Sequence, residues 1–137
     1  MPTSLYQKPK SIKIVDIWHD ETICKDKNTN LPLDGKYEDE EGTIRYLKKG
    51  KYHNENGPSI IATDGFKAYW INNKRHRIDG PSVIYSDGDY TWWINGNFIS
   101  KGRVNNWLKE NDIPLDWNAW TDSDKMLFAL HWSDYNG

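Results

Sequence analysis

The sequence lacks most of the features that are typical of nucleic-acid-binding proteins, membrane-binding proteins and small disulfide-rich secreted proteins. It contains one cysteine, Cys24, in 137 residues, which excludes an intramolecular disulfide framework. Its 18 Lys and Arg residues nearly balance its 20 Asp and Glu residues. No overall basic charge therefore points to nucleic acid or to an anionic membrane. No apolar run approaches the roughly 20 residues that span a bilayer. We expect neither a nucleic-acid nor a membrane partner.

The N-terminal stretch MPTSLYQKPKSIKIVDIW also lacks the apolar segment of a signal peptide. Together with the single cysteine, this favours a reducing compartment, and we expect a cytoplasmic protein. Hydrophobic residues are scarce, at 36%, whereas aromatic residues reach 14%, with eight Trp and eight Tyr. Each buried aromatic ring removes about 150–250 Å² from water. Aromatic side chains must therefore supply much of the core.

No residue pattern typical of catalysis or cofactor binding is present. The acidic run from Asp39 to Glu41 is typical of a solvated turn rather than of a facing acid/base pair. His53 and His76 recur, but they lack the closely spaced companions of a metal-ligand set. We expect their ring nitrogens to hydrogen-bond neighbouring turns. The sequence predicts no catalytic residue, no metal and no cofactor.

The dominant feature of the sequence is a repeat whose period is the offset from His53 to His76. HNENGPSIIATDGFKAYWINNK begins at His53, and HRIDGPSVIYSDGDYTWWINGN begins at His76. A weaker copy precedes them, with Tyr46 at the position of Tyr69. Self-similarity at a fixed period is the signature of a repeat array. We place three units at about 34–56, 57–79 and 80–102.

Each unit is expected to form a β-hairpin. The β-rich stretches PSIIA and KAYWI flank TDG, and PSVIY and YTWWI flank SDG. Asp-Gly between apolar runs favours a tight turn, since glycine accepts a positive φ. The structural turn residues are Gly57, Pro58, Asp64, Gly65, Gly80, Pro81, Asp87 and Gly88. The predicted fold class is mainly β (α+β), an open antiparallel meander closed by C-terminal helices.

The segments before and after the repeats have different patterns, and the segment after them is predicted to be helical. Val104, Trp107 and Leu108 have helical i, i+3, i+4 spacing, and Thr121 with Asp124 has the spacing of a capping box. We expect the second helix to bury apolar residues from the set Leu127, Phe128, Leu130 and Trp132. The predicted organisation is a strand and loop segment at 1–33, the repeats at 34–102 and a helical cap at 103–137, in one folded unit.

The repeated residues resemble the MORN repeat in its bacterial and phage variant. They are His53, Asn56, Gly57, Pro58, Asp64, Gly65, Tyr69 and Trp70, with their counterparts one period later. The resemblance covers about residues 34–100 and implies a stack of β-hairpins. The family is associated with protein–protein contacts, scaffolding and sometimes membrane lipids, and it has no common catalytic chemistry. Repeats followed by a Trp-rich helical tail also look like small accessory proteins of tailed phages.

Side-chain alternation places aromatic residues on both faces of the predicted sheet. Tyr69 and Trp70 point to opposite faces, and so do Trp92 and Trp93. One face can form the core, which leaves the other available to a partner. Trp, Tyr and Arg dominate the energetics of protein interfaces. The predicted partner-binding residues are Tyr69, Trp70, Arg75, Arg77, Trp92 and Trp93.

These patterns favour a non-catalytic protein–protein interaction module. The working hypothesis is a phage accessory protein that binds and inhibits a host or anti-phage defence factor, in the host cytoplasm. One alternative is a binding module for a small ligand, a carbohydrate or a nucleotide. Another is a homo-oligomeric structural protein, such as a homodimer that pairs its sheet edges. All of these hypotheses share the same predicted hairpin array.

Overall fold

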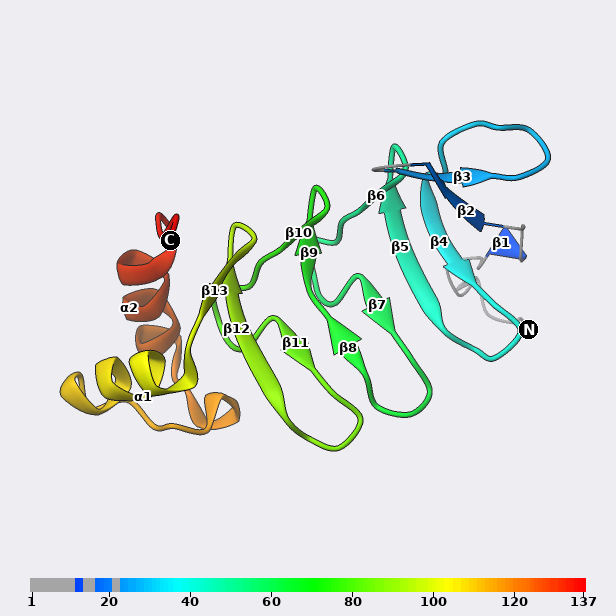
Figure 1. Cartoon of the computed structure of the whole chain (residues 1–137). Coiled ribbons are helices and arrows are strands. Elements are labelled where there is room, and N and C mark those ends of the chain that lie inside the picture. The colour runs from blue at the N-terminus through cyan, green and yellow to red at the C-terminus, as the bar shows by residue number, and fades with distance from the viewer. Residues whose placement is uncertain (1–11, 14–16, 21–22) are drawn as a thin grey trace, which may run out of the picture.

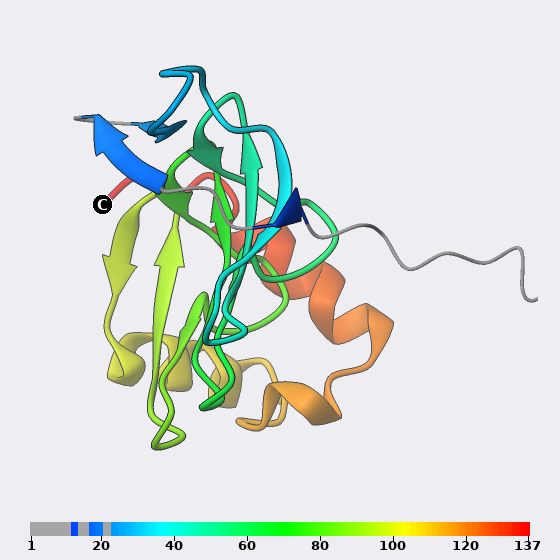
Figure 2. The ribbon, with the colours of Figure 1, turned by 90° about the vertical axis from the view of Figure 1, so that its right-hand side faces the viewer.

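The computed structural model describes residues 12–13, 17–20 and 23–137, so part of the strand and loop segment expected at 1–33 lies outside the described residues. The hairpins stand side by side in a row, with the N-terminal strands at one end and two helices at the other (Figure 1). Seen along this row, the hairpins lie one behind another (Figure 2). The predicted fold class, a mainly antiparallel β-sheet with C-terminal helices, is confirmed.

The strands follow the three units. The first unit contains β4 (Gly35–Glu38), β5 (Ile44–Lys48) and β6 (Lys51–Tyr52). The second contains β7 (Ile60–Ile61), β8 (Lys67–Ala68), β9 (Trp70–Ile71) and β10 (Lys74–Arg75). The third contains β11 (Val83–Ile84), β12 (Tyr90–Ile94) and β13 (Asn97–Ile99). Before them, β1 (Ile12–Lys13) runs parallel to β4, and β2 (Ile17–Asp20) pairs with β3 (Ile23–Asp26).

The strand register recurs with the period of the repeat. Ile44 lies opposite Ile61 where β5 pairs with β7, and Lys67 lies opposite Ile84 where β8 pairs with β11. The hydrogen bonds between units recur as well. The Tyr46 N–H donates to the Ser59 carbonyl at 2.8 Å, and the equivalent bond from Tyr69 to Ser82 is 2.7 Å. Successive units therefore share one backbone path, although their side chains differ.

The turns that join the strands of a hairpin are closed by the Asp-Gly pairs. The Asp64 Oδ1 accepts the Phe66 N–H at 3.0 Å, and the Asp87 Oδ1 accepts the Asp89 N–H at 2.9 Å. The following glycine has a φ of 99° at Gly65 and 90° at Gly88. An L-residue with a side chain would be strained there, so the sequence requires glycine at both positions.

The Gly-Pro pairs serve a different turn. The Pro58 carbonyl accepts a bond from the Asn54 side-chain amide at 3.0 Å, and the Pro81 carbonyl accepts one from Arg77 Nη1 at 3.1 Å. Neither Gly57 nor its counterpart Gly80 has a positive φ. These pairs therefore mark the entry into each new unit, where the donor at the equivalent position changes from Asn to Arg.

The repeated histidines connect one unit to the next. The Asn72 N–H donates to His53 Nδ1 at 3.1 Å, and the Asn95 N–H donates to His76 Nδ1 at 2.9 Å. The φ angles of Asn72 and Asn95 are 48° and 50°, which is left-handed backbone in a tight turn. The prediction that these rings hydrogen-bond turns is confirmed.

The C-terminal cap consists of α1 (Lys101–Glu110), the 3₁₀ turn η1 (Trp117–Ala119) and α2 (Asp122–Trp132). Val104 and Leu108 are buried on α1, as their spacing predicts. Thr121 and Asp124 form the predicted capping box at the start of α2. No helix among residues 23–137 is long and apolar enough to cross a bilayer.

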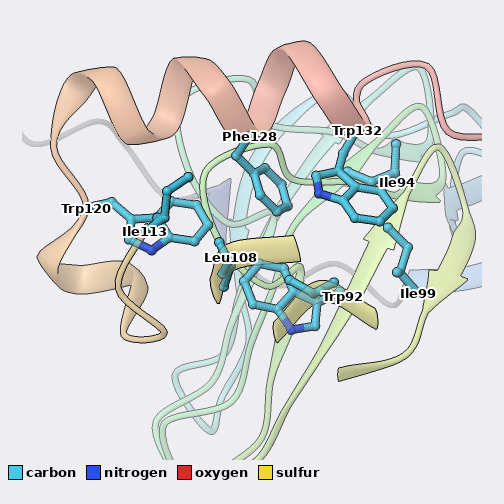
Figure 3. Close-up of a cluster of buried hydrophobic side chains, with 9 residues drawn as sticks. Trp92, Ile94, Ile99, Leu108, Ile113, Trp120, Phe128 and Trp132 are labelled. Carbon is cyan, nitrogen blue, oxygen red and sulfur yellow. The ribbon is translucent and has the colours of Figure 1, made fainter. Parts of the chain in front are cut away.

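The main core lies between the cap and the last hairpin (Figure 3). Its labelled members are Trp92, Ile94, Ile99, Leu108, Ile113, Trp120, Phe128 and Trp132. The Trp92 and Trp120 rings stack with centroids 6.1 Å apart and planes 16° apart. On α2, Phe128 and Trp132 face inward as expected. The other two members of the set are not buried, since Leu127 is 46% and Leu130 is 74% exposed.

A second, smaller core closes the N-terminal end of the array. It contains Cys24, Leu33, Tyr37 and Leu47, with Tyr52 packed against them. Because Cys24 and Leu33 belong to the segment 1–33, that segment contributes to the same folded body as the first unit. Two cores at opposite ends therefore hold the row of hairpins between them.

Candidate functional site

One face of the hairpin row carries a continuous row of aromatic rings and one guanidinium, which we call the aromatic ladder. It consists of Tyr52, Trp70, Arg75, Trp93 and Phe98. The Tyr52 and Trp70 rings are 5.7 Å apart, and the Trp93 and Phe98 rings are 5.4 Å apart. Between them, the Arg75 guanidinium lies 5.0 Å from the Trp70 ring and 4.6 Å from the Trp93 ring. One cation is thus held between two indoles.

The repeat produces the ladder directly. Trp70 lies opposite Arg75 across β9 and β10, and Trp93 lies opposite Phe98 across β12 and β13. The two pairs occupy equivalent positions in the second and third units. Since the hairpins share one backbone path, these cross-strand pairs align along the row.

The ladder runs from a partly buried end to an exposed one. Tyr52 packs against the smaller core, and burial raises the pKa of its hydroxyl to about 12. Phe98, at the other end, is 53% exposed. Beside the ladder is a shallow hollow of about 300 Å³. Its lining consists of Trp70, Asn73, Lys74, Arg75, Trp93, Asn95 and Gly96. The accessible part of the ladder therefore belongs to the second and third units.

Charge is unevenly distributed along the chain. Residues 45–77 contain eight Lys and Arg residues and two acidic residues, a net charge of +6. Residues 110–137 contain one Lys and six acidic residues, a net charge of −5. The middle of the chain is therefore basic and the C-terminal part acidic, although the whole protein is almost neutral. Of the basic residues, Lys74 and Arg75 line the hollow beside the ladder.

The opposite face of β9 borders an open groove of about 760 Å³. Tyr69, Ile71 and His76 line it, and the Arg77 guanidinium lies 4.1 Å from the Tyr69 ring centroid. Arg77 Nε donates to Asp79 Oδ1 at 2.7 Å. Burial lowers the pKa of His76 below its ordinary value. The groove thus contains polar groups that are mostly satisfied within the protein.

The structure separates the six predicted partner-binding residues. Trp70, Arg75 and Trp93 meet on the ladder, whereas Tyr69 and Arg77 lie on the groove face. The prediction that Trp92 contacts a partner is wrong, because its side chain is 1% exposed. Its ring packs between the sheet and the cap, which cover it completely (Figure 3).

Two exposed members of the surface were absent from the sequence-based set. Phe98 completes the ladder and Lys74 lines its hollow. The signal for Phe98 was the period itself, since Phe98 stands one period after Arg75. The hairpin interpretation missed it because the short return strand β10 carries no β-rich pattern.

Within the described residues, no group of three or more His, Cys, Asp or Glu side chains could hold a metal ion. Burial raises the pKa of the Cys24 thiol, which disfavours the reactive thiolate. In the acidic run, Asp39 pairs with Arg45 at 2.9 Å, and the pKa of the Asp39 carboxyl is lowered by that bond. Asp39 also accepts the Thr43 N–H, so its carboxylate closes the turn.

No protein-family model matches this chain, and no curated protein or solved structure does. The function is therefore inferred from the residues and their arrangement.

Proposed function

We propose that the protein binds another protein through the exposed part of the aromatic ladder, and that this partner presents an acidic surface. The observation that carries the proposal is the Arg75 guanidinium held between Trp70 and Trp93, with Phe98 exposed beside them. Aromatic residues and Arg are the residue types that contribute most at protein interfaces.

The physical basis is a surface that is ordered before it binds. An arginine normally loses rotamer freedom when it enters an interface, at a cost of about 0.5–1.5 kcal/mol. The Arg75 guanidinium already contacts two indole rings, so less of its freedom remains to be lost. The basic character of residues 45–77 then favours encounters with an acidic partner.

The recurrence of register, hydrogen bonds and turn geometry from unit to unit supports the proposal that these units are of the MORN type. Such arrays are used for protein contacts in the resembling family, which agrees with a binding function without catalysis. That the partner is a host or defence factor, met in the cytoplasm, stays a prediction.

A charge reversal at the edge of the ladder tests the proposal. A partner captured with tagged wild-type protein is purified, and its affinity is measured by titration calorimetry against variants. Lys74→Glu should weaken binding about fivefold or more and reduce its salt dependence, because Lys74 lines the hollow and is exposed. Lys109→Glu makes the same charge change on exposed α1 and should leave the affinity within about twofold.

An equal effect of both substitutions would reduce the proposal to a general charge effect and contradict it. Light scattering of the pure protein separates the homo-oligomer alternative. A dimer that Lys74→Glu dissociates would show that the ladder binds a second copy rather than a different protein.

A further inference from the structure

The groove on the face opposite the ladder has the dimensions of a ligand site. Its volume of about 760 Å³ lies within the usual range of about 300–1,000 Å³ for small-molecule pockets. The lining comes from turns of the first and second units together with β9. Two repeat-related histidines, His53 and His76, contribute to it. Comparing their surroundings identifies what the groove lacks.

At His53 both ring nitrogens have partners within the protein. Nδ1 accepts the Asn72 N–H, so the proton of the neutral ring is on Nε2. Nε2 lies 3.1 Å from Glu55 Oε2 and donates to it. The pKa of the Glu55 carboxyl is lowered, first by this bond and then by electrostatic interactions with His53 and Lys48. The first unit thus provides its own carboxylate.

At His76 the equivalent arrangement has no carboxylate in the place of Glu55. Nδ1 accepts the Asn95 N–H at 2.9 Å, which again places the proton on Nε2. The counterpart of Glu55 one period later is Ile78, which is 39% exposed and lines the groove. The nearby Asp79 carboxylate accepts from Arg77 instead. In the part of the chain that the structure describes, no acceptor meets His76 Nε2.

We propose that this groove binds a carboxylate carried on a short aliphatic group. The carboxylate accepts the His76 Nε2–H at the place that Glu55 takes beside His53. The aliphatic part contacts Ile71 and Ile78, which line the same groove. The charged side chains of the lining balance, since Lys48 and Arg77 are accompanied by Glu55 and Asp79. The selectivity for a carboxylate therefore comes from the His76 Nε2–H. This site is independent of the ladder, because Ile71 and Trp70 of β9 line the groove and the ladder hollow, respectively.

Two probes distinguish a free acid from a chain terminus. Isovalerate represents a free aliphatic acid, and N-acetyl-leucine represents a C-terminal carboxylate. Isovaleramide and N-acetyl-leucinamide, which have the same shape without the charge, are the matched controls. Each is titrated into the isotopically labelled protein at neutral pH, and NMR follows the His76 ring nitrogens and the Asn95 amide. We expect saturable shifts with a millimolar dissociation constant for the acids and none for the amides.

The variants that test the site exchange the residues at equivalent positions of the two units. Ile78→Glu gives the second unit the carboxylate that the first unit has, so it should weaken binding of either acid at His76 about tenfold or more. Glu55→Ile should open an equivalent site at His53, seen as new shifts of the His53 ring nitrogens. Both positions are at the surface, with Glu55 exposed and Ile78 39% exposed, so neither change removes core packing.

Tighter binding of isovalerate would assign the groove to a free acid, and tighter binding of N-acetyl-leucine to a peptide terminus. The proposal is overturned if neither acid shifts His76 at tens of millimolar, if the amides bind equally well, or if Ile78→Glu leaves the affinity unchanged.

Discussion

The second and third units have the same backbone arrangement, but one of their faces is open in the second unit and covered in the third. In the second, Tyr69 is half-buried and borders an open groove. In the third, the equivalent Trp92 is 1% exposed beneath the cap. The residue paired across the hairpin also changes, from His76 to the buried Ile99. The face is open where the residue at this position is the polar His76, and the helices pack on it where the residue is the apolar Ile99.

The opposite face is partly exposed in both units. Trp70 and Trp93 both remain half-buried members of the ladder. The repeat therefore preserves the ladder in both units while it differentiates the groove face. This comparison indicates that the backbone sets where side chains stand, and that a few substitutions at equivalent positions decide which surfaces are left for partners.

The largest expected effect separates Trp92 from its counterpart. Trp92→Ala should lower the free energy of unfolding by about 3–5 kcal/mol, because it empties the centre of the main core. Tyr69→Ala should lower it by about 1–2 kcal/mol, since Tyr69 is half-buried and loses mainly its contact with Arg77. Urea unfolding of the two variants gives both values. Equal losses would show that the two units do not differ as described.

A second pair compares the turns that begin each unit. A Cβ at Gly80 would lie 2.7 Å from Arg77 Cζ, whereas one at Gly57 would lie 3.8 Å from Asn54 Nδ2. Gly80→Ala should therefore displace Arg77 from Asp79 and from the Pro81 carbonyl, and cost about 1–2 kcal/mol. Gly57→Ala should be neutral or stabilising by less than about 1 kcal/mol. Thermal unfolding of both variants checks the order, and a reversal would contradict it.

A smaller effect concerns pH. The pKa of His76 is lowered by burial, so the unfolded chain binds this proton more readily than the folded one. The free energy of unfolding should then fall as the pH decreases from about 7.5 to about 5.5, and the loss begins near the ordinary His pKa of about 6.5. Urea unfolding across this range measures it.

His76→Asn is the control for this pH effect. Its Oδ1 can accept the Asn95 N–H in place of Nδ1, and it does not titrate. The variant should show a shallower dependence of unfolding free energy on pH. An unchanged dependence would assign the effect to other groups.

Much of this fold could be predicted from the sequence, but only part of the candidate surface could. Period, turn residues and helix caps are local signals, and the Asp64 turn and the Thr121 capping box formed as expected. Burial of Trp92 depends on where the cap packs, which no local pattern encodes. For the same reason the apolar residues of α2 did not indicate which of its faces packs, and Leu130 is 74% exposed.

The grouping of Arg75 with Arg77 failed for another reason. Neighbours two apart share a face only where the chain is extended. β10 ends at Arg75, and the chain turns before Arg77, which binds Asp79 and the Pro81 carbonyl on the groove face. The fold therefore places Arg75 on the ladder and Arg77 on the groove face.

The most direct test of the account compares two exposed apolar side chains, Phe98 on the ladder and Leu130 on the cap, which are 53% and 74% exposed. Each is replaced by Ala, and the affinity for the captured partner is measured by calorimetry. The account predicts that Phe98→Ala weakens binding about tenfold or more, with unfolding unchanged within about 1 kcal/mol, and that Leu130→Ala leaves it unaltered. Full affinity in Phe98→Ala, or a loss confined to Leu130→Ala, would contradict the assignment of the ladder as the binding surface.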